Sequence, residues 1–138
     1  YTTGVFDLFH IGHLKILNRA KKNCDFLIVG VTTDDLMMEY KKKTCVIPFK
    51  ERSKIVANIK SVDKVVAQDS MDKLKALKKY KFNKMFVGDD WKGTEKWKKI
   101  EKEMKSHGVE VIFFPYTKGT SSTIINKTLE KLRGKELF

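Results

Sequence analysis

Two histidines near the start of the chain have the type and spacing that phosphate chemistry requires. They lie in the segment Gly4-Val5-Phe6-Asp7-Leu8-Phe9-His10-Ile11-Gly12-His13, which reads as a strand end, a tight turn and the first turn of a helix. Residues three positions apart share a helix face, so His10 and His13 are predicted to address one phosphate chain. A helix start also attracts anions through its unpaired N–H groups. Gly12 would leave this face bare for a nucleotide. The alternative is a structural role for both histidines.

A second run of phosphate-binding residue types lies near the other end of the chain. Ser121, Ser122 and Thr123 follow Gly119-Thr120 and precede the last helical pattern. Their hydroxyls, together with the N–H groups that open this helix, are predicted to form a second phosphate cradle. The same residues would also serve simply as a helix N-cap, and both interpretations use the same atoms.

Apolar runs and helical periodicity alternate along the chain, which predicts the elements that position these residues. Strands are expected over residues 1–5, 26–31, 62–67, 85–88 and 109–115. Helices are expected over residues 11–23, from Pro48 with Ile55, Val56 and Ile59 on the inner stripe, over 71–80 and 94–106, and from about 122 to Leu132. Residues 37–48, which include Lys41-Lys42-Lys43-Thr44, are predicted to be a mobile basic loop.

This alternation predicts an α/β fold: an open parallel sheet of about five strands, with right-handed crossovers and helices on both faces. Residues 1–138 are expected to form one domain. Ligands of such sheets bind at the carboxyl ends of the strands, near the point where the strand order reverses. Small and charged residues gather at four predicted strand ends, namely at Asp7 and His10, Thr32–Asp34, Asp89-Asp90 and Thr117–Thr123. The site is therefore predicted to be assembled from four loops.

The formal net charge of +12 indicates a polyanionic partner such as a nucleotide, a nucleic acid or a lipid surface. Most lysines, however, fall on the outer faces of predicted helices, as in residues 73–81 and 96–105, and no nucleic-acid-binding motif accompanies them. A basic, non-catalytic anion-binding module is therefore the remote alternative. No apolar run approaches the roughly 18 residues that span a membrane. Cys24 and Cys45 lack metal-ligand spacing, which favours a reducing, cytoplasmic setting.

The ordered set of motifs resembles the cytidylyltransferase branch of the nucleotidyltransferase superfamily, which carries an H-x-G-H signature. The similarity extends over essentially the whole chain, and Gly88-Asp89-Asp90-Trp91-Lys92-Gly93 favours the group that acts on glycerol 3-phosphate. The matching segments are Gly4–His13, Thr33-Asp34, Glu51-Arg52, Val62-Asp63, 88–93 and Thr117-x-Gly119-x-Ser121-Ser122-Thr123. The resemblance implies a Rossmann-like domain that transfers CMP from CTP to a small phosphorylated alcohol, releasing pyrophosphate.

The resemblance also implies a role for each matching residue. His10 and His13 would donate to the CTP phosphates, and Lys41 and Lys43 would hold the α-phosphate and the acceptor phosphate. Asp90 would accept a hydrogen bond from the cytosine amino group, which favours C over U. The other nucleotide contacts would be Val5, Phe6, Gly12, Thr117 and Gly119. The acceptor contacts would be Asp7, Lys43, Arg52, Lys60 and Tyr116, although Asp7 has the alternative role of a turn cap and Arg52 that of a carboxylate partner.

Three departures from the family pattern leave the acceptor open. Tyr116 and Lys60 stand where the family has arginine, and Val5 stands where it has threonine. The alternatives are phosphocholine, phosphoethanolamine or a sugar phosphate as acceptor, or ATP as donor. Mg²⁺ is implied, carried by the CTP phosphates without a dedicated set of protein ligands. A homodimer is implied as well, with Lys60–Asp63 as the expected interface.

Overall fold

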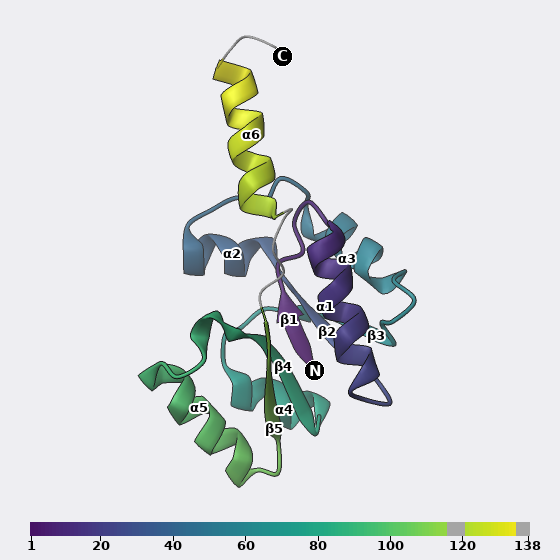
Figure 1. Ribbon diagram of the computed structural model, residues 1–138, viewed down its shortest axis with the longest axis vertical. Helices are drawn as coiled ribbons and strands as arrows, with labels where there is room; N and C mark the ends of the chain where they lie inside the picture. Colours follow the sequence, from purple (N-terminus) through teal and green to yellow (C-terminus); the bar gives the residue numbers. More distant parts are fainter. Residues whose placement is uncertain (116–120, 135–138) are drawn as a thin grey trace.

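The structure is a computed structural model that describes residues 1–115 and 121–134. Its strands are β1 (Thr2–Gly4), β2 (Ile28–Thr32), β3 (Lys64–Gln68), β4 (Lys84–Gly88) and β5 (Glu110–Phe114). Its helices are α1 (Ile11–Lys22), α2 (Asp34–Lys41), α3 (Phe49–Ala57), α4 (Lys73–Tyr80), α5 (Glu95–Ser106) and α6 (Ser122–Gly134), with a short 3-10 turn at Asp89–Trp91. Strands and helices alternate as the hydrophobic pattern predicts (Figure 1).

The five strands form one sheet in the order β3-β2-β1-β4-β5, and every neighbouring pair is parallel. The predicted α/β fold with a parallel sheet of five strands is confirmed. The chain moves outward from β1 through β2 to β3, then crosses back to β4 on the other side of β1. The order therefore reverses between β1 and β4, which is where a ligand is expected to bind.

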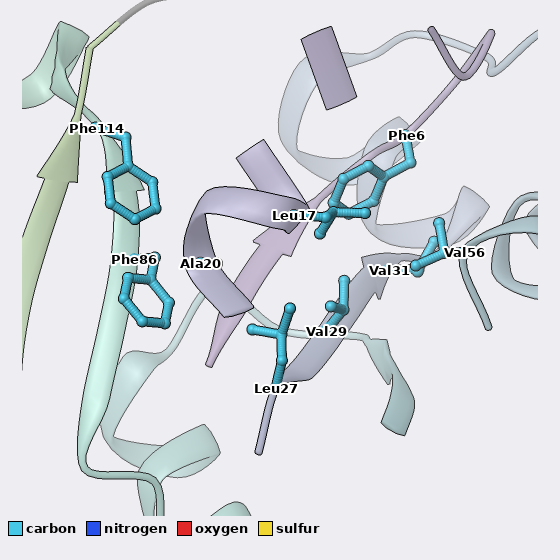
Figure 2. Packing of buried hydrophobic residues seen from close by; sticks show 9 residues of the cluster. All are labelled: Phe6, Leu17, Ala20, Leu27, Val29, Val31, Val56, Phe86 and Phe114. Atoms are coloured by element: carbon cyan, nitrogen blue, oxygen red, sulfur yellow. The ribbon is translucent and has the colours of Figure 1, made fainter. Parts of the chain in front are cut away.

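Helices cover both faces of the sheet because alternate strand residues point to opposite faces. On one face, Leu17 and Ala20 of α1 and Val56 of α3 are fully buried against Val29 and Val31 of β2, as Figure 2 shows. On the other face, α4 and α5 contribute buried apolar side chains to a second cluster. This cluster consists of Tyr1, Leu77, Phe82, Met85, Met104 and Val109.

Side-chain caps determine where three of the helices begin. The Thr33 hydroxyl accepts a hydrogen bond from Leu36 N, Asp72 accepts from the backbone of Leu74 and Lys75, and Thr94 accepts from Trp97 N. Such oxygens satisfy N–H groups that have no partner within the helix. Thr33, directly after β2, is therefore the N-cap of α2.

Three local predictions were wrong. Residues 37–41 belong to helix α2, which continues until Lys42 adopts a left-handed conformation at φ 52° and its N–H bonds to Met38 O. Ile55, expected on the inner stripe of α3, is 45% exposed, because the neighbouring Val56 faces the core and adjacent helix residues point about 100° apart. Phe26, expected at the start of a buried strand, precedes β2 and is 58% exposed.

Helix α6 differs from the others because it projects from the end of the molecule where the strands finish (Figure 1). None of the residues of α6 whose side chains the structure describes is buried. Its first turn contacts the β1–α1 loop, since Ser122 Oγ donates to Asp7 O at 2.5 Å. The fold therefore brings the start of α6 to the start of α1, although the two are more than one hundred residues apart in the sequence.

Candidate functional site

A cavity of about 700 Å³ lies at the carboxyl ends of β1 and β4. Its wall includes the end of β1 and the β1–α1 loop (residues 3–7), Lys41 at the end of α2, Lys43 after it, Trp91 after β4, and Ser122 and Thr123 of α6. The cavity thus lies at the strand ends near the strand-order reversal, where the sequence predicted a ligand site. A volume of this size accommodates a nucleotide-sized ligand.

His10 and His13 lie together at the start of α1, with ring centroids 3.9 Å apart. His10 is the N-cap residue: its Nδ1 accepts from Gly12 N at 3.1 Å, while its own backbone N–H donates to His13 Nδ1 at 3.2 Å. This reciprocal arrangement is a capping box built from two imidazoles. His13 lines the cavity and is packed edge-on against the ring of Phe6.

The capping hydrogen bonds decide which nitrogen of each ring carries the proton. Because both Nδ1 atoms accept from a backbone N–H, each neutral ring is protonated at Nε2 and has one N–H left to donate. Burial, with a smaller contribution from His10, lowers the pKa of His13 to about 4, although Asp7 opposes this. Burial also lowers the pKa of His10. Both groups are therefore neutral donors at neutral pH.

Phe6 and Gly4 determine the course of the loop that presents these histidines. Phe6 has a positive φ of 53°, a conformation that is unusual outside glycine, and its buried ring belongs to the core in Figure 2. A Cβ at Gly4 would lie 2.8 Å from the Phe6 ring, closer than carbon atoms pack. The Phe6 side chain thus anchors the loop in the core. Phe6 and Val5 both line the cavity, where they were expected as nucleotide contacts.

Asp7 joins the β1–α1 loop to the lysine-bearing segment that follows α2. Its carboxylate oxygens accept from Val46 N at 2.8 Å and Ile47 N at 2.9 Å, and the residue is only 9% exposed. Asp7 therefore caps backbone N–H groups of a loop, in agreement with the alternative role of a turn cap. Of the three consecutive lysines, Lys41 and Lys43 line the cavity, as the resemblance implied.

Arg52 pairs with a carboxylate, which was one of the two roles considered for it. Its Nη2 donates to Asp34 Oδ1 at 2.6 Å, and its other nitrogens donate to the carbonyl oxygens of Val5, Thr32 and Ile47 at 2.6–2.8 Å. The guanidinium is completely buried. Arg52 was expected to contact the acceptor, and this geometry does not agree with that expectation. The guanidinium of Arg52 already donates its hydrogen bonds to the loops that surround the cavity.

The start of α6 divides its three hydroxyl groups between different tasks. Ser121 Oγ accepts from Ile124 N at 3.1 Å and so caps the helix. A helix N-cap was the alternative to a phosphate cradle for this segment. Ser122, bonded to Asp7 O, and Thr123 line the cavity. Tyr116, Thr117 and Gly119, which were expected as acceptor and nucleotide contacts, lie outside the described residues.

Six of the predicted contacts that the structure describes do not line the cavity, namely His10, Gly12, Arg52, Lys60, Asp90 and Ser121. Gly12 is buried and its N–H is bound by His10 Nδ1, so it does not present the bare surface that was expected. Lys60 is exposed in the turn before β3, at the amino edge of the sheet, whereas the cavity is at the carboxyl edge. Asp90 is exposed on the turn after β4, directly before the cavity-lining Trp91.

The cavity also contains residues that the motifs did not reveal. Gln68 ends β3, and Lys73 begins α4 with its Nζ 5.9 Å from the centroid of the Trp97 ring. These three residues line the cavity together with Lys96. Burial, and secondarily the charge of Lys96, lowers the pKa of Lys73. The strand-end rule, had it been applied to β3 as to the other strands, would have indicated Gln68.

Residues 1–115 and 121–134 contain no group of three or more His, Cys, Asp or Glu side chains arranged to hold a metal ion. In the same part of the chain, no helix combines the length and the apolar character needed to cross a bilayer.

Comparisons with known proteins extend these observations beyond the geometry. The family model described as cytidylyltransferase-like matches residues 1–128. A glycerol-3-phosphate cytidylyltransferase of Bacillus spizizenii is 36% identical over 132 residues, which cover 95% of this chain and 96% of the relative. An FAD synthase of Archaeoglobus fulgidus is 33% identical over 137 residues, which cover 96% of this chain and 98% of the relative.

A solved structure agrees with the fold. The lipopolysaccharide core biosynthesis protein of Thermoplasma volcanium superposes with a TM-score of 0.70 at 26% identity, covering 86% of this chain and 95% of that protein. The match to the family model spans the histidine pair, the parallel sheet and the first half of α6. Sequence, fold and cavity thus agree that this chain belongs to the cytidylyltransferase-like family of nucleotidyltransferases.

Proposed function

We propose that this protein transfers CMP from CTP to glycerol 3-phosphate and so forms CDP-glycerol and pyrophosphate. The observation that carries the proposal is the histidine pair at the start of α1: each ring has an Nε2–H left to donate, His13 lines the nucleotide-sized cavity, and the centroid of the His10 ring lies 3.9 Å from that of the His13 ring. The similarity to glycerol-3-phosphate cytidylyltransferases over 95% of the chain supports the choice of donor and acceptor.

The reaction needs positioning and charge neutralisation more than it needs an acid or a base. An oxygen of the acceptor phosphate attacks the α-phosphorus of CTP, the bond to the bridging oxygen breaks, and pyrophosphate leaves with the electron pair. His10 and His13 would donate to the phosphate oxygens where negative charge develops. Lys41 and Lys43 would neutralise the α-phosphate and the acceptor phosphate, and Ser122 and Thr123 are also in the cavity wall.

Base recognition is assigned to Asp90, and acceptor binding in part to Lys73. Asp90 would accept from the cytosine 4-amino group, and its place beside Trp91 at the cavity supports this role. Lys73 is a partly buried cation in the wall and would pair with the acceptor. Val5, Phe6, Thr117, Gly119 and Tyr116 stay predicted contacts from the family resemblance.

Magnesium fits the site as an ion carried by the triphosphate. Asp7, the cavity-lining carboxylate of the described residues, already accepts two backbone N–H groups, so the surrounding side chains do not form a metal cage. Mg²⁺ binds readily through phosphates and water. When bound, it would supply charge neutralisation of the phosphates.

The proposed setting is a homodimer in the cytoplasm. Cys24 and Cys45 are both free thiols, which supports a reducing compartment. The exposed Lys60 supports an interface at Lys60–Asp63, although Asp63 is also bound within the chain by Lys21 Nζ at 2.5 Å. Sedimentation of the wild type and of Lys60→Glu would test this, since a monomeric wild type contradicts the dimer.

A pyrophosphate-release assay with each of the four nucleoside triphosphates tests the proposed reaction. We expect turnover with CTP and glycerol 3-phosphate, and a loss on the order of 100- to 1000-fold in His13→Ala. Asp90→Asn should raise the use of UTP relative to CTP, because an amide can donate to the uracil carbonyl. Equal rates with all four nucleotides would remove the cytidine assignment.

The second candidate is an adenylyltransferase with the same fold. The FAD synthase relative, which matches 96% of the chain, favours this alternative. ATP preference in the same assay, with glycerol 3-phosphate inactive as acceptor, would select it.

A further inference from the structure

Gln68 is a buried polar residue of the cavity wall that no motif explains. It is the last residue of β3, is 6% exposed and lines the cavity. It pairs in register with Thr32, the last residue of β2, so both side chains lie at the carboxyl edge of the sheet. This position is on the side of β1 away from the turn that carries Asp90.

Two neighbours fix the orientation of the Gln68 carboxamide. Thr32 Oγ1 donates to its Oε1 at 2.6 Å, and its Nε2 donates to the Met71 sulfur at 3.7 Å. A thioether is a weak acceptor, whereas a carboxamide nitrogen has two N–H groups to donate. A buried donor without a strong acceptor costs free energy. Among the described residues, the Met71 sulfur is the only acceptor for this nitrogen. The Nε2–H groups can therefore donate a stronger hydrogen bond to an oxygen atom of a ligand.

The charges around Gln68 restrict the kind of ligand. Lys73 and Lys96 line the same cavity, and Lys73 Nζ already lies over the Trp97 ring. Asp7 is the one carboxylate among the described residues of the wall, and both its oxygens accept from backbone N–H groups. An ammonium group would meet two lysines and no free carboxylate, whereas a hydroxyl oxygen could accept from the amide.

We infer that Gln68 is the residue that recognises the acceptor, through a hydrogen bond from its Nε2–H to a hydroxyl of a phosphorylated polyol. This inference rests on the proposed function and deepens it. The site therefore selects the phosphate ester of an uncharged polyol, and the positive charges in the wall discriminate against phosphorylated amino alcohols such as phosphocholine and phosphoethanolamine. A substrate without a hydroxyl would leave the Gln68 Nε2–H donor without a strong acceptor. Binding of such a substrate is therefore disfavoured relative to a polyol phosphate.

The test compares two acceptors within each protein preparation. With CTP as donor, kcat/KM is measured for glycerol 3-phosphate and for n-propyl phosphate, which has the same three-carbon chain without hydroxyls. The wild type should favour glycerol 3-phosphate by about tenfold or more. Gln68→Leu and Gln68→Glu, which remove the donor, should reduce this ratio to within about threefold of unity. Asn58→Leu is the matched control, because its amide donates to Lys54 O outside the cavity.

The ratio is internal to each preparation, so partial loss of folded protein cancels from it. A second measurement needs no variant: phosphocholine and phosphoethanolamine should react at least about tenfold more slowly than glycerol 3-phosphate in the wild type. If either reacts equally fast, or if the ratio persists in both Gln68 variants, the inference is overturned while the proposed function stands. If the wild type does not turn over glycerol 3-phosphate at all, both are overturned.

Discussion

At the scale of single residues, His10 and His13 act as neutral hydrogen-bond donors and as helix caps at once. The two Nδ1 atoms accept backbone N–H groups, which leaves Nε2–H of each ring for a ligand. Protonation of either imidazole would place a positive charge at the start of α1. This would be unfavourable, because that end of the helix already carries the positive end of the helix dipole. Burial and the neighbouring His10 lower the pKa of His13 in agreement with this.

The depressed pKa of His13 predicts how stability depends on pH. The pKa is about 4 in the folded protein and near 6.5 in an unfolded chain, so the unfolded state binds more protons between these values. The free energy of unfolding should therefore fall as the pH decreases from about 6.5 to about 4. Urea unfolding at several pH values measures this slope. His13→Asn cannot titrate, and a slope unchanged in this variant would contradict the assignment.

The identity of Gly4 is explained by its contact with the Phe6 ring. Gly4→Ala should destabilise the protein by about 1–3 kcal/mol, because the new Cβ would lie 2.8 Å from the Phe6 ring. Gly88→Ala is the matched control at the end of β4, since no atom lies within 4 Å of its ideal Cβ. Denaturant unfolding of both variants gives the comparison. Equal stability of the two would show that Phe6 moves aside without cost.

At the scale of elements, the loops around the cavity are held by buried ionic side chains. Asp7 binds the backbone of residues 46 and 47, and Arg52 binds the carbonyls of Val5, Thr32 and Ile47 as well as Asp34. These contacts connect the histidine loop to the lysine segment. The polar network therefore helps to determine where the segment with Lys43 lies.

Asp7→Ala should release the segment after α2. Loss of the carboxylate leaves Val46 and Ile47 N–H groups without their partner, so trypsin should cleave near Lys41–Lys43 several-fold faster than in the wild type. Asp25→Ala, an exposed carboxylate outside this network, is the control. Quantitative mass spectrometry of the digest measures the rates. Identical cleavage in the two variants would contradict the role assigned to Asp7.

At the scale of the whole molecule, the reversal of strand order between β1 and β4 brings distant segments to one cavity. The start of α1 and the start of α6 meet there through Ser122 and Asp7. The rest of α6 projects away, with no buried side chain among those described (Figure 1). A ligand that bridges the two helix starts would therefore have its largest effect on the order of α6.

Nucleotide binding should slow hydrogen exchange in the first turns of α6. A ligand held by both helix starts stabilises the bound state by about 2.7 kcal/mol at one hundred times its Kd. Exchange is measured by mass spectrometry with and without CTP and Mg²⁺, and α4 serves as the internal reference. We expect protection at residues 122–126 in the wild type but not in His13→Ala. Protection confined to α4 would contradict a site that involves α6.

The sequence by itself was sufficient for the fold class and for the edge of the sheet at which the cavity lies. Alternating strands and helices determine a parallel sheet, and the histidine motif after the first strand indicates its ligand-binding edge. Local patterns were less informative where an apolar period is short. The α2 helix beyond Met37 was missed for this reason, since its end depends on the conformation of Lys42.

The tertiary structure decided what each polar side chain does. Arg52, Ser121 and Gly12 have residue types that suit phosphate binding, and Asp7 has one that suits an acceptor hydroxyl. Yet the hydrogen-bonding groups of all four are engaged by partners within the chain. Gln68 carries no motif, and only the pairing of β2 with β3 places it in the cavity wall. Residue type determines which hydrogen bonds are chemically possible, whereas the fold determines which partners are within reach.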